Sequence, residues 1–89
     1  MTTVTFAKAF RRHVECPDED VEGATVGDAL CDYFARHPAV RSYVLDDEGS
    51  FRRHVTVFVD GDQVDHRHGP ATAVGDNSVI HLFQALSGG

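Results

Sequence analysis

The stretch "SVIHLFQALSGG", residues 78–89, joins a strand-like apolar run to a pair of glycines. The alternation of residue types over 78–86 predicts a final β-strand. Gly88 and Gly89 have no Cβ, so their backbone can pass a constriction and adopt conformations closed to other residues. An ordinary frayed end is the plain alternative. The remainder of the sequence decides between a functional tail and a frayed one.

Composition limits the classes of protein that the chain can belong to. It has 89 residues, 42% of them hydrophobic and 25% charged, which is typical of one globular domain with a small core and no deep active-site cavity. The net charge of −6 argues against an extended nucleic-acid surface, which needs a basic stripe. No apolar run approaches the roughly 18 residues of a membrane span, and the N-terminus lacks a signal-peptide pattern. We expect a cytoplasmic protein, a monomer when free, with no nucleic-acid or membrane partner.

The clearest helix signal begins at Thr25. Thr25 can cap a helix, and Asp28 stands three residues later, as in a capping box. An apolar face with helical spacing follows, formed by Val26, Ala29, Leu30, Tyr33 and Phe34. "HPAV", residues 37–40, ends the helix because proline disfavours helical geometry at the residue before it. A further turn on the same core is expected from Val40, Tyr43, Val44 and Leu45.

The N-terminal third predicts a first hairpin. An extended segment begins at Val4 and runs through "AKAFRRHVEC", residues 7–16. The next stretch, "CPDEDVEGA", residues 16–24, contains proline, four acids and glycine, which is typical of a loop or a ragged edge strand. Neither segment suggests a site.

A second strand pair is predicted after residue 50. Val55, Val57 and Val59 share one face of a strand, and Thr56 and Phe58 share the other. Asp60-Gly61 then predicts a type I′ hairpin turn, which needs positive φ at both central positions. Residues 65–77 form a long polar connection to the final strand.

This order of elements predicts an α+β, two-layer domain with a mixed sheet of four to five strands packed on one main helix. The other face of the sheet is left to solvent or to a partner. We expect one domain over residues 1–86 and a flexible C-terminal tail over residues 87–89 that ends in Gly-Gly.

Three stretches carry a resemblance to a known family: "ATVGDAL" (24–30), "VFVDGDQV" (57–64) and "IHLFQALSGG" (80–89). With them the chain resembles the ubiquitin-like β-grasp sulfur carriers and modifiers. That group includes the small subunit of molybdopterin synthase, the thiamine sulfur carrier and the small archaeal modifier proteins. The resemblance implies a β-grasp fold, with the terminal Gly-Gly as the reactive end.

The resemblance also implies the chemistry. An ATP-dependent activating enzyme would adenylate the carboxylate of Gly89, and the acyl group would pass to sulfide or to the lysine of a target protein. A sulfur-accepting synthase or the target proteins would then be the next partners. The chain has no GxxxxGK[ST], GxSxG or HExxH motif, so we expect a carrier that is not an enzyme and binds no cofactor, the ATP being used by its partner.

The last two stretches also resemble ubiquitin, and the alignment puts Phe58, His81 and Phe83 where ubiquitin displays its recognition patch. Strand alternation agrees, because Ile80 and Leu82 would face the helix while His81 and Phe83 face away. We expect these three residues to form a partner-binding patch. If the protein is joined to other copies of itself, the candidate acceptors are Lys8, which is the chain's only lysine, and the α-amine of Met1 if it is unblocked.

Two alternatives stay open. His66 and His68 flank Arg67, and with His81 or His13 they could bind a transition metal, although such a loop is usually only solvated. The chain could also be a ubiquitin-like interaction module whose tail is never activated. The two cysteines lack a CxxC spacing, so we expect free thiols and no metal site built on them.

Overall fold

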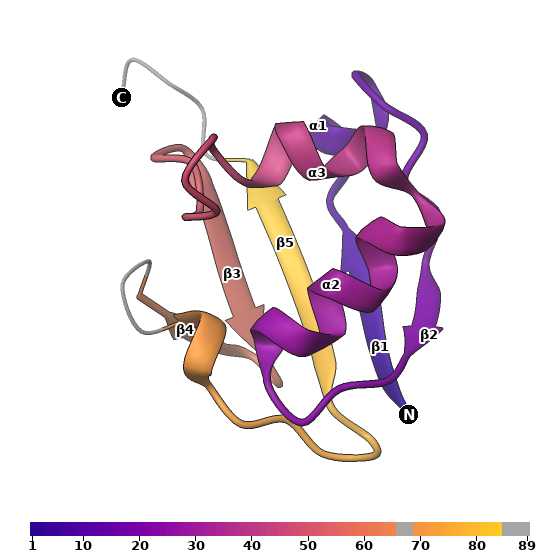
Figure 1. Cartoon of the computed structure of the whole chain (residues 1–89), viewed down its shortest axis with the longest axis vertical. Coiled ribbons are helices and arrows are strands. Elements are labelled where there is room, and N and C mark those ends of the chain that lie inside the picture. Colours follow the sequence, from indigo (N-terminus) through magenta and orange to yellow (C-terminus); the bar gives the residue numbers. More distant parts are fainter. Residues whose placement is uncertain (66–68, 85–89) are drawn as a thin grey trace.

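Five strands form one mixed sheet within residues 1–65 and 69–84, the part of the chain that the computed structural model describes. The strands are β1 (Thr2–Phe6), β2 (Glu19–Val21), β3 (Val55–Val59), β4 (Asp62–Val64) and β5 (Val79–Gln84). The helices are α1 (Lys8–Arg11), α2 (Val26–Arg36), α3 (Pro38–Val44) and the 3₁₀ turn η1 (Gly69–Ala71). The strand order is β2-β1-β5-β3-β4, and α2 crosses one face of the sheet (Figure 1). The predicted α+β architecture is confirmed.

The central strand is β5, the last in the sequence. It pairs in parallel with β1, where Phe6 lies opposite Leu82, and antiparallel with β3, where Val55 lies opposite Gln84. The end of β5 is therefore held between the end of β1 and the start of β3. This arrangement fixes the place from which residues 85–89 continue.

The main helix forms as predicted. The hydroxyl of Thr25 accepts a hydrogen bond from the backbone N–H of Asp28 at 3.2 Å, which satisfies one of the unpaired donors of the first turn. All five residues of the predicted apolar face are buried. The helix ends at Arg36, and Pro38 begins α3 at a position where its missing N–H costs no hydrogen bond.

The further turn, α3, packs on the core through Val40 and Val44, which are both fully buried. The expectation that Tyr43 also packs there is wrong, because its side chain is 39% exposed. Each helical residue is rotated by about 100° from the previous one, so Tyr43 falls on the flank when Val40 and Val44 point inward. Its ring instead stacks on His13, with the centroids 6.5 Å apart.

The first hairpin needs a correction. β1 and β2 do pair antiparallel, and β2 forms the edge strand that was one of the two alternatives for residues 16–24. Residues 8–11, however, form α1 instead of continuing the strand. The helical turn brings Phe10 back over the core, where it is 1% exposed and packs edge-to-face on Phe6 with ring centroids 5.4 Å apart. An extended segment would carry Phe10 away from the core. Burial of this one aromatic ring therefore outweighs the local strand pattern.

The predicted hairpin turn between β3 and β4 is confirmed. Asp60 and Gly61 have φ values of 51° and 89°, the positive angles that a type I′ turn requires. The carboxylate of Asp60 also accepts a hydrogen bond from the backbone N–H of Val79 at 2.9 Å, which ties the turn to the start of β5.

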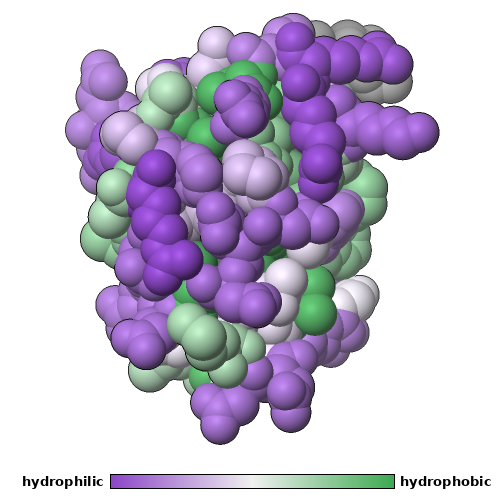
Figure 2. Space-filling model, turned by 90° about the vertical axis from the view of Figure 1, so that its right-hand side faces the viewer, coloured by the Kyte–Doolittle hydropathy of each residue, from purple (hydrophilic) through white to green (hydrophobic). Residues whose placement is uncertain are grey.

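The core lies between the sheet and α2. It is built from the inner faces of the strands, the apolar face of α2 and the ring of Phe10 from α1. Its members include Val4, Phe6, Val26, Leu30, Tyr33, Val57, Ile80 and Leu82. Across the described ranges, no helix is long and apolar enough to cross a membrane. The side of the molecule that carries β2 is mostly hydrophilic (Figure 2).

Candidate functional site

Strand β5 presents different residues to the two sides of the sheet. Ile80 and Leu82 are 0% exposed and belong to the core, whereas Phe83 is 42% exposed and His81 is partly exposed. The predicted faces of this strand are therefore confirmed. We call the side away from α2 the open face.

On the open face the structure brings the three predicted patch residues together. Phe58 lies opposite His81 in the register of β3 and β5. The ring of Phe83 packs edge-to-face on Phe58, with centroids 5.4 Å apart, and on His81, with centroids 4.5 Å apart. Phe83 is the exposed member, while Phe58 is partly buried. Binding of a partner by this aromatic cluster stays a prediction.

Two further residues belong to this cluster and were not predicted. The hydroxyl of Thr5 and Nδ1 of His81 share a hydrogen bond across the parallel pair β1 and β5, which fixes the orientation of the imidazole. Val79, which is 41% exposed, extends the apolar surface along β5. Alternation from His81 would have identified Val79, whereas nothing in the local sequence indicates that Thr5 lies beside His81.

The predicted reactive glycines, Gly88 and Gly89, lie outside the described residues. The structure describes β5 up to Gln84 and the backbone around it. The N–H of Ala7 donates to the carbonyl of Leu82 at 2.9 Å on one side, and β3 begins on the other with Val55 opposite Gln84. Lys8, the predicted acceptor, follows directly and is exposed at the start of α1.

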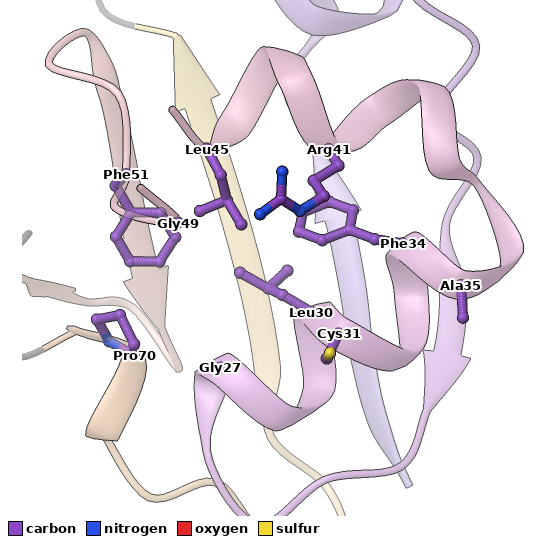
Figure 3. Close-up of a pocket in the computed structure, with 10 residues that line it drawn as sticks. All are labelled: Gly27, Leu30, Cys31, Phe34, Ala35, Arg41, Leu45, Gly49, Phe51 and Pro70. Atoms are coloured by element: carbon purple, nitrogen blue, oxygen red, sulfur yellow. The ribbon is translucent and has the colours of Figure 1, made fainter. Parts of the chain in front are cut away.

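A cavity of about 380 Å³ lies on the opposite side of the molecule, between α2, α3, the segment 45–51 and η1 (Figure 3). Its walls include Leu30, Phe34 and Phe51, which are only 2%, 7% and 5% exposed. Arg41 reaches across it from α3 (Figure 3). Because so little of these apolar side chains is accessible, a ligand in this cavity would bury little apolar surface.

The histidines and cysteines give no metal site within residues 1–65 and 69–84, where no group of three His, Cys, Asp or Glu side chains is placed to hold an ion. His66 and His68, on which the metal alternative depends, lie outside those ranges. Both cysteines are free, as predicted. Cys16 is buried, and burial raises the pKa of its thiol, whereas Cys31 is exposed.

With this geometry established, comparison with known proteins identifies the family. The sequence profile of the ThiS family matches residues 6–89, nearly the whole chain and both terminal glycines. The chain belongs to the ThiS family. Proteins of this family are ubiquitin-like sulfur carriers and modifiers and are not themselves catalysts, which agrees with the prediction of a carrier.

Individual relatives support the assignment to the ThiS family. Small archaeal modifier protein 1 of Haloferax volcanii is 44% identical over 71 residues, which cover 79% of this chain and 77% of the relative. A crystal structure of that modifier from the same organism superposes with a TM-score of 0.77 at 30% identity, covering 99% of this chain and 98% of the other. A CysO protein, crystallised as the BexX/CysO complex of Amycolatopsis orientalis, gives a TM-score of 0.83 at 24% identity over the full length of both chains. The β-grasp fold is therefore confirmed.

Proposed function

We propose that this ThiS-family protein carries an activated acyl group at Gly89, whose carboxylate an ATP-dependent activating enzyme adenylates. The observation that carries the proposal is the family match, which extends through residues 88 and 89. The ATP is bound and used by the enzyme, and this chain binds no cofactor of its own. Because the reaction consumes ATP, we expect the protein to act in the cytoplasm.

The chemistry has two stages. A carboxylate is a poor acylating group, so its oxygen first attacks the α-phosphate of ATP, pyrophosphate leaves, and a mixed anhydride with AMP forms. Sulfide can then displace AMP to give a thiocarboxylate, the sulfur of which a synthase accepts. Alternatively a lysine amine of a target protein displaces the leaving group and an isopeptide bond forms. Both routes start from the same Gly89 adenylate.

The described structure supports this role in two ways. The tail continues from the end of the central strand, so docking of the sheet also fixes where the tail enters the enzyme. The open face carries the exposed Phe83 ring beside His81, with the exposed Val79 two residues before His81 on the same strand, and an apolar cluster of this kind is typical of an interaction surface. The CysO of A. orientalis, which has this fold, was crystallised in a complex with BexX. We infer that the activating enzyme docks on the open face.

The test is ATP–pyrophosphate exchange with the activating enzyme from the same cells. Removal of Gly88 and Gly89 should abolish exchange without unfolding the domain, since a terminal tail contributes few buried contacts. Gly75→Ala is the matched control, because a Cβ there would meet nothing closer than the Ser78 hydroxyl at 4.0 Å. It should leave exchange unchanged. Undiminished exchange by the truncated protein would refute the proposal.

The open face would equally serve a ubiquitin-like interaction module that is never activated. Intact-mass analysis of the protein from its own cells separates the two functions. A species in which sulfur replaces one oxygen, or a conjugate to another protein, supports the carrier. An unmodified protein together with no exchange activity supports the interaction module.

A further inference from the structure

The positive charges of this acidic chain are concentrated in two short segments. Five of its eight lysines and arginines lie within residues 8–12 and 52–53. The chain has fourteen acids, yet none falls within residues 7–14 or 52–54. A histidine follows each segment directly, His13 after the first and His54 after the second. Two locally basic segments therefore stand out in a protein whose net charge is −6.

The fold places these two segments on either side of the end of β5. α1 begins two residues after Phe6, the partner of Leu82, and Arg53 stands two residues before Val55, the partner of Gln84. Figure 1 shows α1 and the start of β3 at the same end of the sheet as the tip of β5. In Figure 2 strongly hydrophilic side chains project from this same upper end. The basic segments thus flank the point where the tail begins.

Not all of these cations are available to a partner. Arg11 forms an ion pair with Asp18 at 2.7 Å, and Nε of Arg52 donates to the carbonyl of Ser42 at 2.6 Å. Lys8, Arg12 and Arg53 are exposed, and their side chains make no hydrogen bond or ion pair with another residue in the described part of the chain. We call these three residues the basic collar.

We propose that the basic collar docks on acidic side chains that surround the tail-binding channel of the activating enzyme. This inference rests on the proposed function and names the chemistry of the partner surface. Most of this acidic protein repels an acidic surface, whereas the collar attracts it, so the charges favour the orientation in which the tail faces the channel. The open face supplies apolar contact beside it.

A direct contact between the collar and the phosphates of ATP fits the geometry less well. Residues 85–89, when extended into the channel, span up to about 17 Å. The adenylated carboxylate then lies at the far end of that distance from the collar. The collar is therefore positioned to contact the rim of the channel and not the reacting phosphate, and it should affect docking more than chemistry.

The experiment compares two double variants with the same change in net charge. Arg12→Gln with Arg53→Gln removes two collar charges, and Ala71→Glu with Asn77→Asp adds two negative charges at exposed positions away from the end of β5. Ala71 lies in η1, which packs against α2 on the side opposite the open face. Pyrophosphate exchange is measured against the concentration of the carrier, for each variant and for the wild type. Thermal unfolding of all three proteins checks that the fold is retained.

We expect kcat/KM for the carrier to fall about fivefold in the collar variant and less than about twofold in the control, as is usual for rim charges. The kcat and the KM for ATP should not change. The difference between the variants should shrink as ionic strength rises from roughly 0.05 to 0.5 M, because salt screens exposed charges.

Each other outcome overturns the inference in a distinguishable way. Equal kcat/KM values for the two variants, with normal exchange by the wild type, would refute docking through the basic collar but would not contradict the proposed carrier function. A change in kcat or in the KM for ATP would show that these arginines act on the nucleotide. Failure of the wild-type protein to support exchange would remove the proposed function and the collar together.

Discussion

Two adjacent residues of β5 should respond very differently to truncation to alanine. Leu82 points into the core and is 0% exposed, whereas Phe83 lies on the open face and is 42% exposed. The exchange of either side chain for alanine leaves the backbone pairing of the central strand in place. The pair therefore tests which side of the sheet is the core and which is free for a partner.

The expected free energies follow from burial. Truncation of a fully buried leucine usually costs about 2–5 kcal/mol, because a cavity remains. Full burial of a phenylalanine contributes about 1.5–3 kcal/mol, and Phe83, little more than half covered, should contribute about 1 kcal/mol. Part of that comes from its edge-to-face contact with Phe58. Although Phe83 is the larger side chain, Leu82→Ala should be the more damaging change.

The assay is thermal and urea denaturation, both monitored by circular dichroism, with pyrophosphate exchange as a second measurement. Phe83→Ala should lower the melting temperature by about 4–8 °C, as expected for about 1 kcal/mol in a domain of this size, and should weaken activation of the folded protein. Leu82→Ala should cause the larger loss of stability. If Phe83→Ala costs about 3 kcal/mol or more, the open face is packed in the native protein and the assignment of the two faces is wrong.

Three further predictions concern other parts of the molecule. The buried Tyr33 donates its hydroxyl hydrogen to the carbonyl of Pro17 at 2.7 Å, and burial raises the pKa of Tyr33 above its usual value. The stability that the neutral phenol contributes is therefore complete below about pH 10 and is lost as the pH rises further. Tyr33→Phe should cost about 1 kcal/mol at neutral pH and should reduce the fall in the free energy of unfolding that urea titrations measure at alkaline pH. Gly23→Ala should destabilise by about 1–3 kcal/mol, because the new Cβ would lie 2.5 Å from the backbone N of Ala29; an unchanged urea midpoint would contradict that contact. If the protein modifies others, single copies should predominate, and peptide mapping should find that Lys8→Arg removes lysine-linked chains; abundant chains through Lys8 in the wild type would contradict the expected scarcity.

Much of the fold was predictable because its signals are local. The cap at Thr25, the helical spacing that follows it and the φ requirements of Asp60-Gly61 all depend on residues close together in the sequence. The two faces of β5 follow from alternation in the same way. The structure confirms each of these features, since in each case packing and local preference favour the same conformation.

The candidate site was only partly predictable. Phe58, His81 and Phe83 were placed on one face from alternation and resemblance, but Thr5 was missed. Its hydrogen bond to His81 joins residues 76 positions apart in the chain. Parallel pairing between the first and last strands has no local signature, because its register depends on how the whole core packs.

By itself, the sequence determined the main helix, the hairpin turn and the inward-facing residues of the strands, and it carried the Gly-Gly ending on which the proposed function rests. Only the tertiary structure decided that residues 8–11 turn into a helix, that Tyr43 lies outside the core, and that Lys8, Arg12 and Arg53 flank the end of β5. The physical reason is the same for all three. Each depends on contacts between segments far apart in the chain, and the free energy of burying Phe10, Val40 and Val44 in the core outweighs the weak local preferences of the residues around them.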